Sequence, residues 1–372
     1  MKTALLLLAL TAVALGQSFF NMRGLGEITP ATEARQNALG DPWALSLSNP
    51  GAFVTLPGTR FDLSALFSAL YGRQRGNDRL LGDARPAAFQ AAVPLPLDGR
   101  IILGLDQRFN QDFNVWSDST TGPYRHQVIG RGGIHALRAG LAKAFFDRLA
   151  IGLEYNYHLG AAREDWRFYA RSGSSFSTDT VEIDYSGSGL RAGASFQTSR
   201  LGVALLYESQ LALTARRYTR IHGVTADSLR TYRLQLPHVA GVGVSGSPLE
   251  KLRLVAAVEY RPWSAATVDD TLLGYRDALR ISAGGEYDLL ENVPLRFGYS
   301  HQYWYFDATR GPVTEHAISL GSGLPIPKFG SLDFAGSTAL RRAGDLTEIT
   351  GRLMVTLAYR EQWQKRTRRW GY

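Results

Sequence analysis

The residue types that most often carry out chemistry are few and scattered in this sequence. No His-Glu-x-x-His pair and no Gly-x-Ser-x-Gly elbow occurs, and the seven histidines stand far apart, at positions 126, 135, 158, 222, 238, 301 and 316. The absence of cysteine excludes thiolate metal sites and thiol catalysis. Residues 241–246 match a dinucleotide fingerprint by letters, but they stand in a strand pattern with no helix after them. We therefore predict no enzyme, metal site or cofactor, although a Ser–His or Asp–His pair assembled by the fold stays open.

Four arginines are the candidates for ligand contacts, because a buried carboxylate requires a cationic or hydroxyl partner. They stand at polar positions of expected strands: Arg253, Arg280, Arg296 and Arg352. The alternative is a structural lattice of ion pairs with glutamates on neighbouring strands, namely Glu154, Glu208, Glu259 and Glu286.

The elements that would carry these side chains are amphipathic strands. Within residues 149–157, large apolar side chains occupy the odd positions and small or polar ones the even positions. Because side chains of a strand alternate between its two faces, this pattern predicts a sheet with one apolar and one polar face. Similar stretches recur at 60–72, 86–97, 99–117, 124–146, 148–171, 177–198, 200–222, 227–248, 251–268, 274–290, 293–307, 311–326, 329–343 and 346–361.

Fourteen such strands predict an all-β fold, a 14-stranded antiparallel transmembrane β-barrel with apolar residues facing lipid and polar residues facing the lumen. The mean hydropathy of −0.14 agrees, because every second residue of a spanning strand faces water. Tyrosines are expected at the rims of the apolar band: Tyr157, Tyr207 and Tyr260 at the outer rim, and Tyr287 and Tyr359 at the inner one. A soluble β-sandwich is the alternative, but its core would not set Arg and Glu repeatedly opposite apolar rows.

The connections alternate in length. Turns after even-numbered strands are compact, whereas most of those after odd-numbered strands are longer, as in 73–85, 117–124 and 264–274. Outer-membrane barrels have short periplasmic turns and longer outer loops, so both chain ends are expected in the periplasm. Pro237 interrupts the eighth expected strand, where a bulge or a sideways opening of the wall would accommodate it.

Four regions follow along the chain. Residues 1–18 read as a signal peptide, 19–59 as a plug, 60–362 as the barrel and 363–372 as a basic periplasmic tail. The tail holds a basic cluster, and the whole chain carries a formal charge of +8. On an exported chain we expect this tail to meet water or anionic lipid, not nucleic acid.

The segment before the barrel contains the most specific motif. Residues 34–41, Ala-Arg-Gln-Asn-Ala-Leu-Gly-Asp, precede Ser48-Asn49-Pro50-Gly51-Ala52. These two stretches together resemble the N-terminal hatch of FadL-type outer-membrane proteins, in which a short helix leads to an Asn-Pro-Ala signature. In this sequence the third residue of the signature is Gly51. The resemblance implies a 14-stranded barrel with a hatch in its lumen, and Asn49, Pro50 and Gly51 are the candidate gate residues.

The resemblance also implies passive uptake of hydrophobic small molecules, such as long-chain fatty acids, across the bacterial outer membrane. The PorV-like branch is similar in the same hatch and in an aromatic-basic C-terminus, here residues 361–366. That branch implies an alternative role as a scaffold or secretion component that binds exported proteins. The expected partners are a hydrophobic substrate, outer-membrane lipid, the barrel-assembly machinery and, in the alternative, secretion-system proteins.

Overall fold

The computed structural model describes residues 18–29, 31–55, 58–74, 77–118, 124–146, 148–170, 175–222, 228–290, 293–308 and 311–361. The signal-peptide prediction, apart from Ser18, and the basic-tail prediction concern residues outside these ranges.

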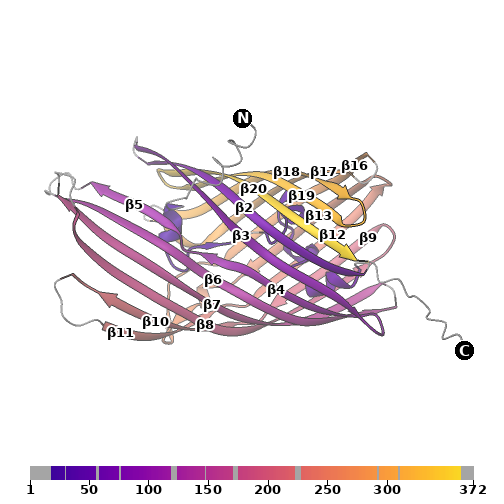
Figure 1. Ribbon diagram of the computed structural model, residues 1–372, viewed down its shortest axis with the longest axis horizontal. Coiled ribbons are helices and arrows are strands. Elements are labelled where there is room, and N and C mark those ends of the chain that lie inside the picture. The colour runs from indigo at the N-terminus through magenta and orange to yellow at the C-terminus, as the bar shows by residue number, and fades with distance from the viewer. Residues whose placement is uncertain are drawn as a thin grey trace, which may run out of the picture.

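Fourteen strands close into one antiparallel barrel (Figure 1). Each strand pairs with the next and the last pairs with the first, which confirms the predicted fold. The ring consists of β2 (Thr59–Gln74), β3 (Asn77–Leu95), β4 (Gly99–Asn110), β6 (Tyr124–Phe145), β7 (Leu149–Ala170), β8 (Ser175–Gln197), β9 (Leu201–Glu208), β12 (Val239–Leu249), β13 (Leu252–Arg261), β16 (Ala278–Leu290), β17 (Val293–Ala308), β18 (Gly311–Ile326), β19 (Gly330–Ala343) and β20 (Leu346–Glu361).

Six further strands lie at or inside this ring: β1 (Glu27–Ile28), β5 (Phe113–Asp118), β10 (Leu211–Arg220), β11 (Ser228–Leu236), β14 (Thr267–Val268) and β15 (Thr271–Leu272). Strand β10 follows β9 along the chain and continues the wall by pairing with β8. Strand β11 precedes β12 and pairs with β10. The expected strand 227–248 is therefore broken at Pro237, which has no amide hydrogen to give to a ladder. The expected strand 200–222 breaks opposite it, at residues 209 and 210.

The prediction of one outer loop is wrong. Residues 73–85 were predicted to form a loop, but β3 begins at Asn77 and pairs with β2 as far as Gln74. Gly76, Asp78, Gly82 and Asp83 suggest a loop by composition. Pairing with a neighbouring strand overrode that local preference, as is common in sheets.

The two faces of the wall have opposite character. Along β7, residues 149–159 alternate between outward side chains that are mostly exposed and inward ones that are buried. The predicted rim tyrosines Tyr157, Tyr207, Tyr260 and Tyr287 are 40–48% exposed on the outer surface. Since the surrounding outward side chains are apolar, the outer surface is suited to lipid.

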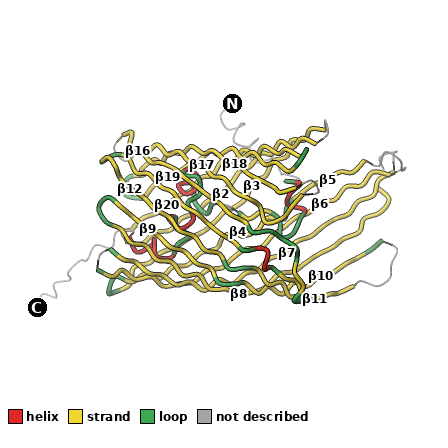
Figure 2. The backbone as a smooth tube through the Cα atoms, turned by 180° about the vertical axis from the view of Figure 1, so that it is seen from behind, coloured by secondary structure: helices red, strands yellow, loops and turns green. Residues whose placement is uncertain are grey.

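The lumen is filled by the N-terminal segment, defined here as residues 18–58. It comprises η1 (Phe19–Met22), β1, α2 (Ala34–Ala38), η2 (Trp43–Leu45) and η3 (Pro50–Thr55), seen among the wall strands in Figure 2. Its elements contact β6–β9 and β12, and also β17–β20 on the other side. The predicted plug inside the barrel is thus confirmed.

Outside the N-terminal segment, the described residues contain one helical turn, η4 (Trp263–Ala265), which lies between β13 and β14. Among the described residues, no helix has the length and apolar character needed to cross a membrane.

Candidate functional site

The Asn-Pro-Gly turn holds the N-terminal segment against the wall. The side chain of Asn49 is fully buried, and its Nδ2 donates to the carbonyls of Ala44 (2.8 Å) and Leu205 (3.1 Å). Its Oδ1 accepts from the amide of Gly51 at 2.9 Å, which closes the turn. Asn49 therefore bonds both to its own segment and to the backbone of β9.

The wall beside this turn is made of glycine. Gly152 on β7 and Gly193 on β8 face each other in the ladder. A Cβ atom on Gly193 would lie 1.9 Å from Asn49 Oδ1, and one on Gly152 would lie 2.6 Å from the Pro50 carbonyl carbon. Only glycine leaves room for so close an approach.

The structure places the four predicted ligand arginines around the segment and does not bring them together. Arg296 contacts Glu286 and Asp333, each at 2.6 Å, so both neighbours belong to the wall. Arg253 donates to Ser245 Oγ at 3.3 Å and makes no ion pair with the described carboxylates. Arg296 therefore belongs to the structural lattice of ion pairs. Arg253 makes only a weak hydrogen bond within the described part of the chain.

The other two bind the N-terminal segment itself. Arg280 pairs with Asp41 and donates to Gln302 Oε1 at 2.7 Å, and Arg352 pairs with Glu27. Two arginines that were predicted to bind a ligand carboxylate thus bind carboxylates of the N-terminal segment instead.

Glu27 is a functional candidate that sequence reasoning missed. Its carboxylate is bound by both Arg341 and Arg352, while Arg341 also contacts Glu315 at 2.5 Å. Burial alone would raise the pKa of Glu27, but Arg341, Arg352 and Arg85 outweigh it and hold this pKa at about 2. No periodic pattern surrounds Glu27 in the sequence, so nothing near it indicates a role. The alternation of side chains along β19 and β20 could have shown only that Arg341 and Arg352 face the lumen.

A second buried lattice crosses the lumen beside the Asn-Pro-Gly turn. Arg191 contacts Glu208 and, at 3.4 Å, Glu154, while Arg138 contacts Asp106 at 2.6 Å. Arg108 reaches Glu208 at 2.5 Å. Arg191 also donates to the carbonyl of Ser48 at 3.3 Å, so the lattice holds the segment as well as the wall.

The wall has a gap beside β1. Strand β3 pairs with β4 only between Ala88 and Leu95, whereas residues 77–86 of β3 pair with β2 alone. The edge of β4 that β3 leaves free is taken by β1, with Glu27 opposite Asn110 and Ile28 opposite Phe109. The N-terminal segment therefore covers an open edge of the barrel wall.

The half of the lumen around η1 and η4 is packed with aromatic and aliphatic side chains. Phe20 packs near Trp304, and Tyr305 stacks on Trp263 with ring centroids 4.3 Å apart. Lumen cavities lined by described residues are small, about 130 Å³ beside Arg253 and about 30 Å³ beside His158. Pockets for drug-sized ligands measure about 300–1,000 Å³, so neither cavity admits such a molecule.

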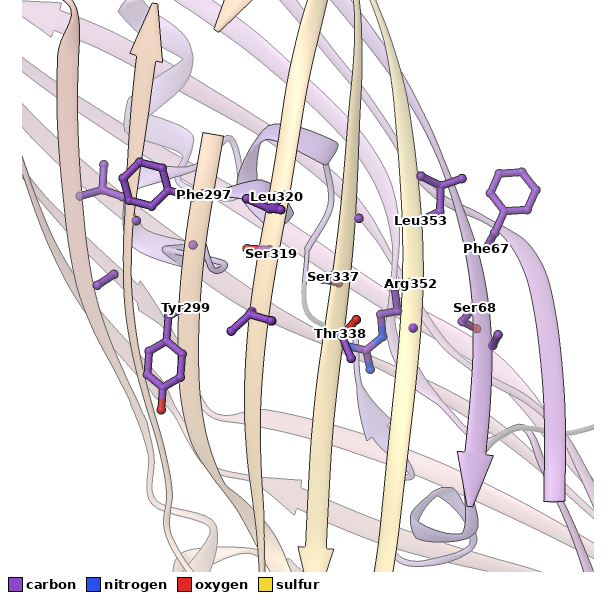
Figure 3. Close-up of a pocket in the computed structure, with 18 of the residues that line it drawn as sticks. Phe67, Ser68, Phe297, Tyr299, Ser319, Leu320, Ser337, Thr338, Arg352 and Leu353 are labelled. Atoms are coloured by element: carbon purple, nitrogen blue, oxygen red, sulfur yellow. The ribbon is translucent and has the colours of Figure 1, made fainter. Parts of the chain in front are cut away.

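A broad hollow lies on the outside of the wall (Figure 3). It measures about 1180 Å³, and its rim is formed by outward side chains such as Phe67, Phe297 and Leu320 around small residues of β19 and β20. Since the surrounding outward side chains are apolar, the hollow is suited to contact with lipid acyl chains.

Comparison with known proteins assigns the family. The sequence model of the BamG family matches residues 3–368, which is nearly the whole chain. This chain belongs to the BamG family. Among curated proteins, none matches it.

Solved structures show what the BamG-family chain is similar to in fold. A monoaromatic hydrocarbon channel, the TodX deltaS2S3 mutant, superposes with a TM-score of 0.67 at 13% identity and covers 88% of this chain and 99% of its own. The toluene transporter TodX of Pseudomonas putida gives 0.63 at 14% identity, covering 88% and 97%. A FadL homologue of Pseudomonas aeruginosa gives 0.60 at 15% identity, covering 94% and 100%.

These likenesses confirm the FadL-like fold suggested by residues 34–52. A closed barrel of this size with an apolar exterior is the architecture of outer-membrane proteins, and the BamG-family chain is an outer-membrane barrel.

Proposed function

We propose that this protein is a gated outer-membrane channel for hydrophobic small molecules, closed in the described state by its N-terminal segment. The observation that carries the proposal is the pairing of β1 with the free edge of β4. If β1 leaves, the lumen gains an opening towards the membrane between β3 and β4. The hydrocarbon channels and the FadL homologue of similar fold support this function.

The same movement would expose cations inside the lumen. With Glu27 withdrawn, Arg341 and Arg352 lose their shared carboxylate and can receive another one. A fatty acid brings a carboxylate together with an apolar chain for the aromatic half of the lumen around η1 and η4. Amphipathic acids therefore fit this lumen better than pure hydrocarbons do. We propose that residues 49–51 stay bound to the wall while the rest of the gate moves.

A disulfide across β1 and β4 tests the gate. Ile28 and Phe109 are directly opposite, and the bond from Thr29 N to Arg108 O (3.0 Å) makes them a non-hydrogen-bonded pair. Such pairs have Cα atoms about 4.5 Å apart, within the range of a disulfide. The chain has no cysteine of its own, so Ile28→Cys with Phe109→Cys would form a single defined bridge.

The measurement is uptake of a labelled long-chain fatty acid into proteoliposomes. We expect the oxidised variant to match empty liposomes and the reduced variant to match the unmodified protein, with the two single-cysteine variants as controls. Equal uptake by the oxidised and reduced forms would exclude movement of β1. Equal uptake by the unmodified protein and by empty liposomes would exclude transport altogether.

A scaffold function is the second candidate, and the packed lumen favours it. Ion pairs from Asp41 and Glu27 to the wall and the aromatic packing around Phe20 are what a permanently closed barrel would show. In this case the outer surface would bind exported proteins or subunits of an assembly or secretion machine. Affinity purification from native membranes with the disulfide-locked variant tests it, because a scaffold keeps its partners when the gate is locked.

A further inference from the structure

Two histidines lie side by side on the outer surface of the wall. His301 of β17 and His316 of β18 are directly opposite in the ladder, with ring centroids 4.4 Å apart. The hydroxyl of Tyr299 is 2.8 Å from His316 Nδ1, and Tyr303 packs edge-on against His301 at 4.9 Å. Ionisable side chains on a lipid-facing surface are costly and rare, so the pair requires an explanation.

The pair lies at the height of the outer membrane surface. From Ile326, at the periplasmic end of β18, to His316 there are ten residues. At a rise of about 3.3 Å per residue and a tilt of about 40°, His316 stands roughly 25 Å above that end. The apolar band of such barrels is about 25 Å tall, so the imidazoles reach the level of the lipid headgroups.

A guanidinium group completes the patch. Arg342 of β19 is directly opposite Thr314 and therefore diagonal to His316, at about 7–8 Å between backbones. Its side chain is exposed, whereas that of the adjacent Arg341 is buried in the lumen. The outward-facing positions 299–303, 314–318 and 338–342 contain no Asp or Glu.

This arrangement is suited to a phosphate group. If the Tyr299 hydroxyl donates to Nδ1 of His316, the proton of this ring stands on Nε2, free to donate to another acceptor. Together with the His301 ring and the Arg342 fork, it forms a set of donors without a competing carboxylate. Arginine binds phosphate oxygens through charge-assisted hydrogen bonds, and the Nε2–H group of a neutral imidazole adds a further hydrogen bond.

We propose that His301, His316 and Arg342 form a binding site for the phosphorylated headgroup of an outer-leaflet glycolipid. The site is independent of the lumen and of the gate, because all three side chains face outwards. Apolar side chains below it, such as Ile318 and Leu320, would contact the acyl chains of the same lipid.

Retention of bis-phosphorylated lipid A by the full protein in detergent micelles, counted by native mass spectrometry, tests the proposal. We expect His301→Gln with His316→Gln, and separately Arg342→Gln, to weaken retention at least tenfold. His238→Gln is the matched control, because His238 is another exposed histidine stacked on a tyrosine, Tyr207, at 5.8 Å. It should leave retention unchanged.

Lipid A stripped of its phosphates separates headgroup recognition from apolar contact. We expect the unmodified protein to retain it at least tenfold less, with no further loss in the variants. Equal retention of both lipids, or an equal loss in His238→Gln, would overturn the proposal. Complete displacement of lipid A by millimolar inorganic phosphate would also overturn it, since the site would then serve free phosphate.

Discussion

At the scale of single residues, charge is the feature that distinguishes the lumen. Most buried carboxylates are paired with arginines, and the carboxylates come both from the wall and from the N-terminal segment. Such pairs are costly to break, because removal of one partner leaves the other charge buried and unpaired. Their role here is to fix one position of the segment within the barrel.

Glu208→Gln should destabilise the barrel strongly, because it leaves Arg108 and Arg191 without this carboxylate. We expect a loss of about 3–5 kcal/mol in the free energy of unfolding, measured by urea titration in lipid vesicles. The control is Glu250→Gln, at an exposed turn, with a change within about 0.5 kcal/mol. A loss under 1 kcal/mol for Glu208→Gln would show that water reaches the lattice.

Asp41 predicts a pH dependence. Burial raises the pKa of this carboxyl to about 6, with Glu259 acting in the same direction and Arg280 opposing it. The folded state then binds the proton more tightly than the unfolded state, so the free energy of unfolding should rise as the pH falls from about 6 to about 4. Asp41→Asn should remove this component, measured as the difference between the two unfolding profiles. Parallel profiles would contradict the shifted pKa.

At the scale of elements, the wall is adapted to the segment that it encloses. Strands β7 and β8 are among the longest, yet each has a glycine where η3 approaches. Strand β3 leaves one edge of β4 free for β1. Barrel and segment are therefore one packing unit, and the gate depends on contacts that substitutions can weaken selectively.

Gly193→Ala should loosen the closed state. The added methyl group would overlap Asn49 Oδ1, and such overpacking costs about 1–3 kcal/mol. We expect the Asn-Pro-Gly turn to move and proteoliposomes to admit a small sugar several-fold faster in a swelling assay. Gly336→Ala is the matched control, because its Cβ would meet open space on β19. Equal swelling of the two variants would show that the turn does not seal the lumen.

At the scale of the whole molecule, the stability of the fold depends on whether lipid or water surrounds the barrel. Large apolar side chains are exposed on strands throughout the ring, and so much exposed apolar surface would be a liability in water. The interior of the barrel differs from the core of a soluble protein, because aromatic packing around η1 and η4 is combined with buried ion pairs such as Arg280–Asp41 and Arg296–Glu286.

Leu320→Arg tests the membrane setting. Leu320 is 64% exposed and lies near the middle of the apolar band, where arginine costs about 2–4 kcal/mol. Leu97→Arg, in the exposed turn between β3 and β4, should change the free energy of unfolding by under about 0.5 kcal/mol. Unfolding in lipid vesicles measures both. Equal effects would contradict a lipid-facing position for Leu320.

The sequence by itself determined the strands and their faces, because alternation of side chains is a local property of extended backbone. Residues 149–157 show it without knowledge of any partner. Each of the fourteen expected strands has a counterpart in the ring, although those at 99–117, 200–222, 227–248 and 251–268 are interrupted. The short motif at Asn49 likewise indicated the plug.

Only the tertiary structure decided which charges meet. Glu27 and Arg341 are 314 positions apart, and they come together only when the ring closes around the segment. The gap beside β3 and the pairing of His301 with His316 depend on strand register, which no single strand specifies. The arginines predicted to receive a ligand were chosen by the face on which they lie; closure of the barrel determined that Arg280 and Arg352 meet carboxylates of the plug.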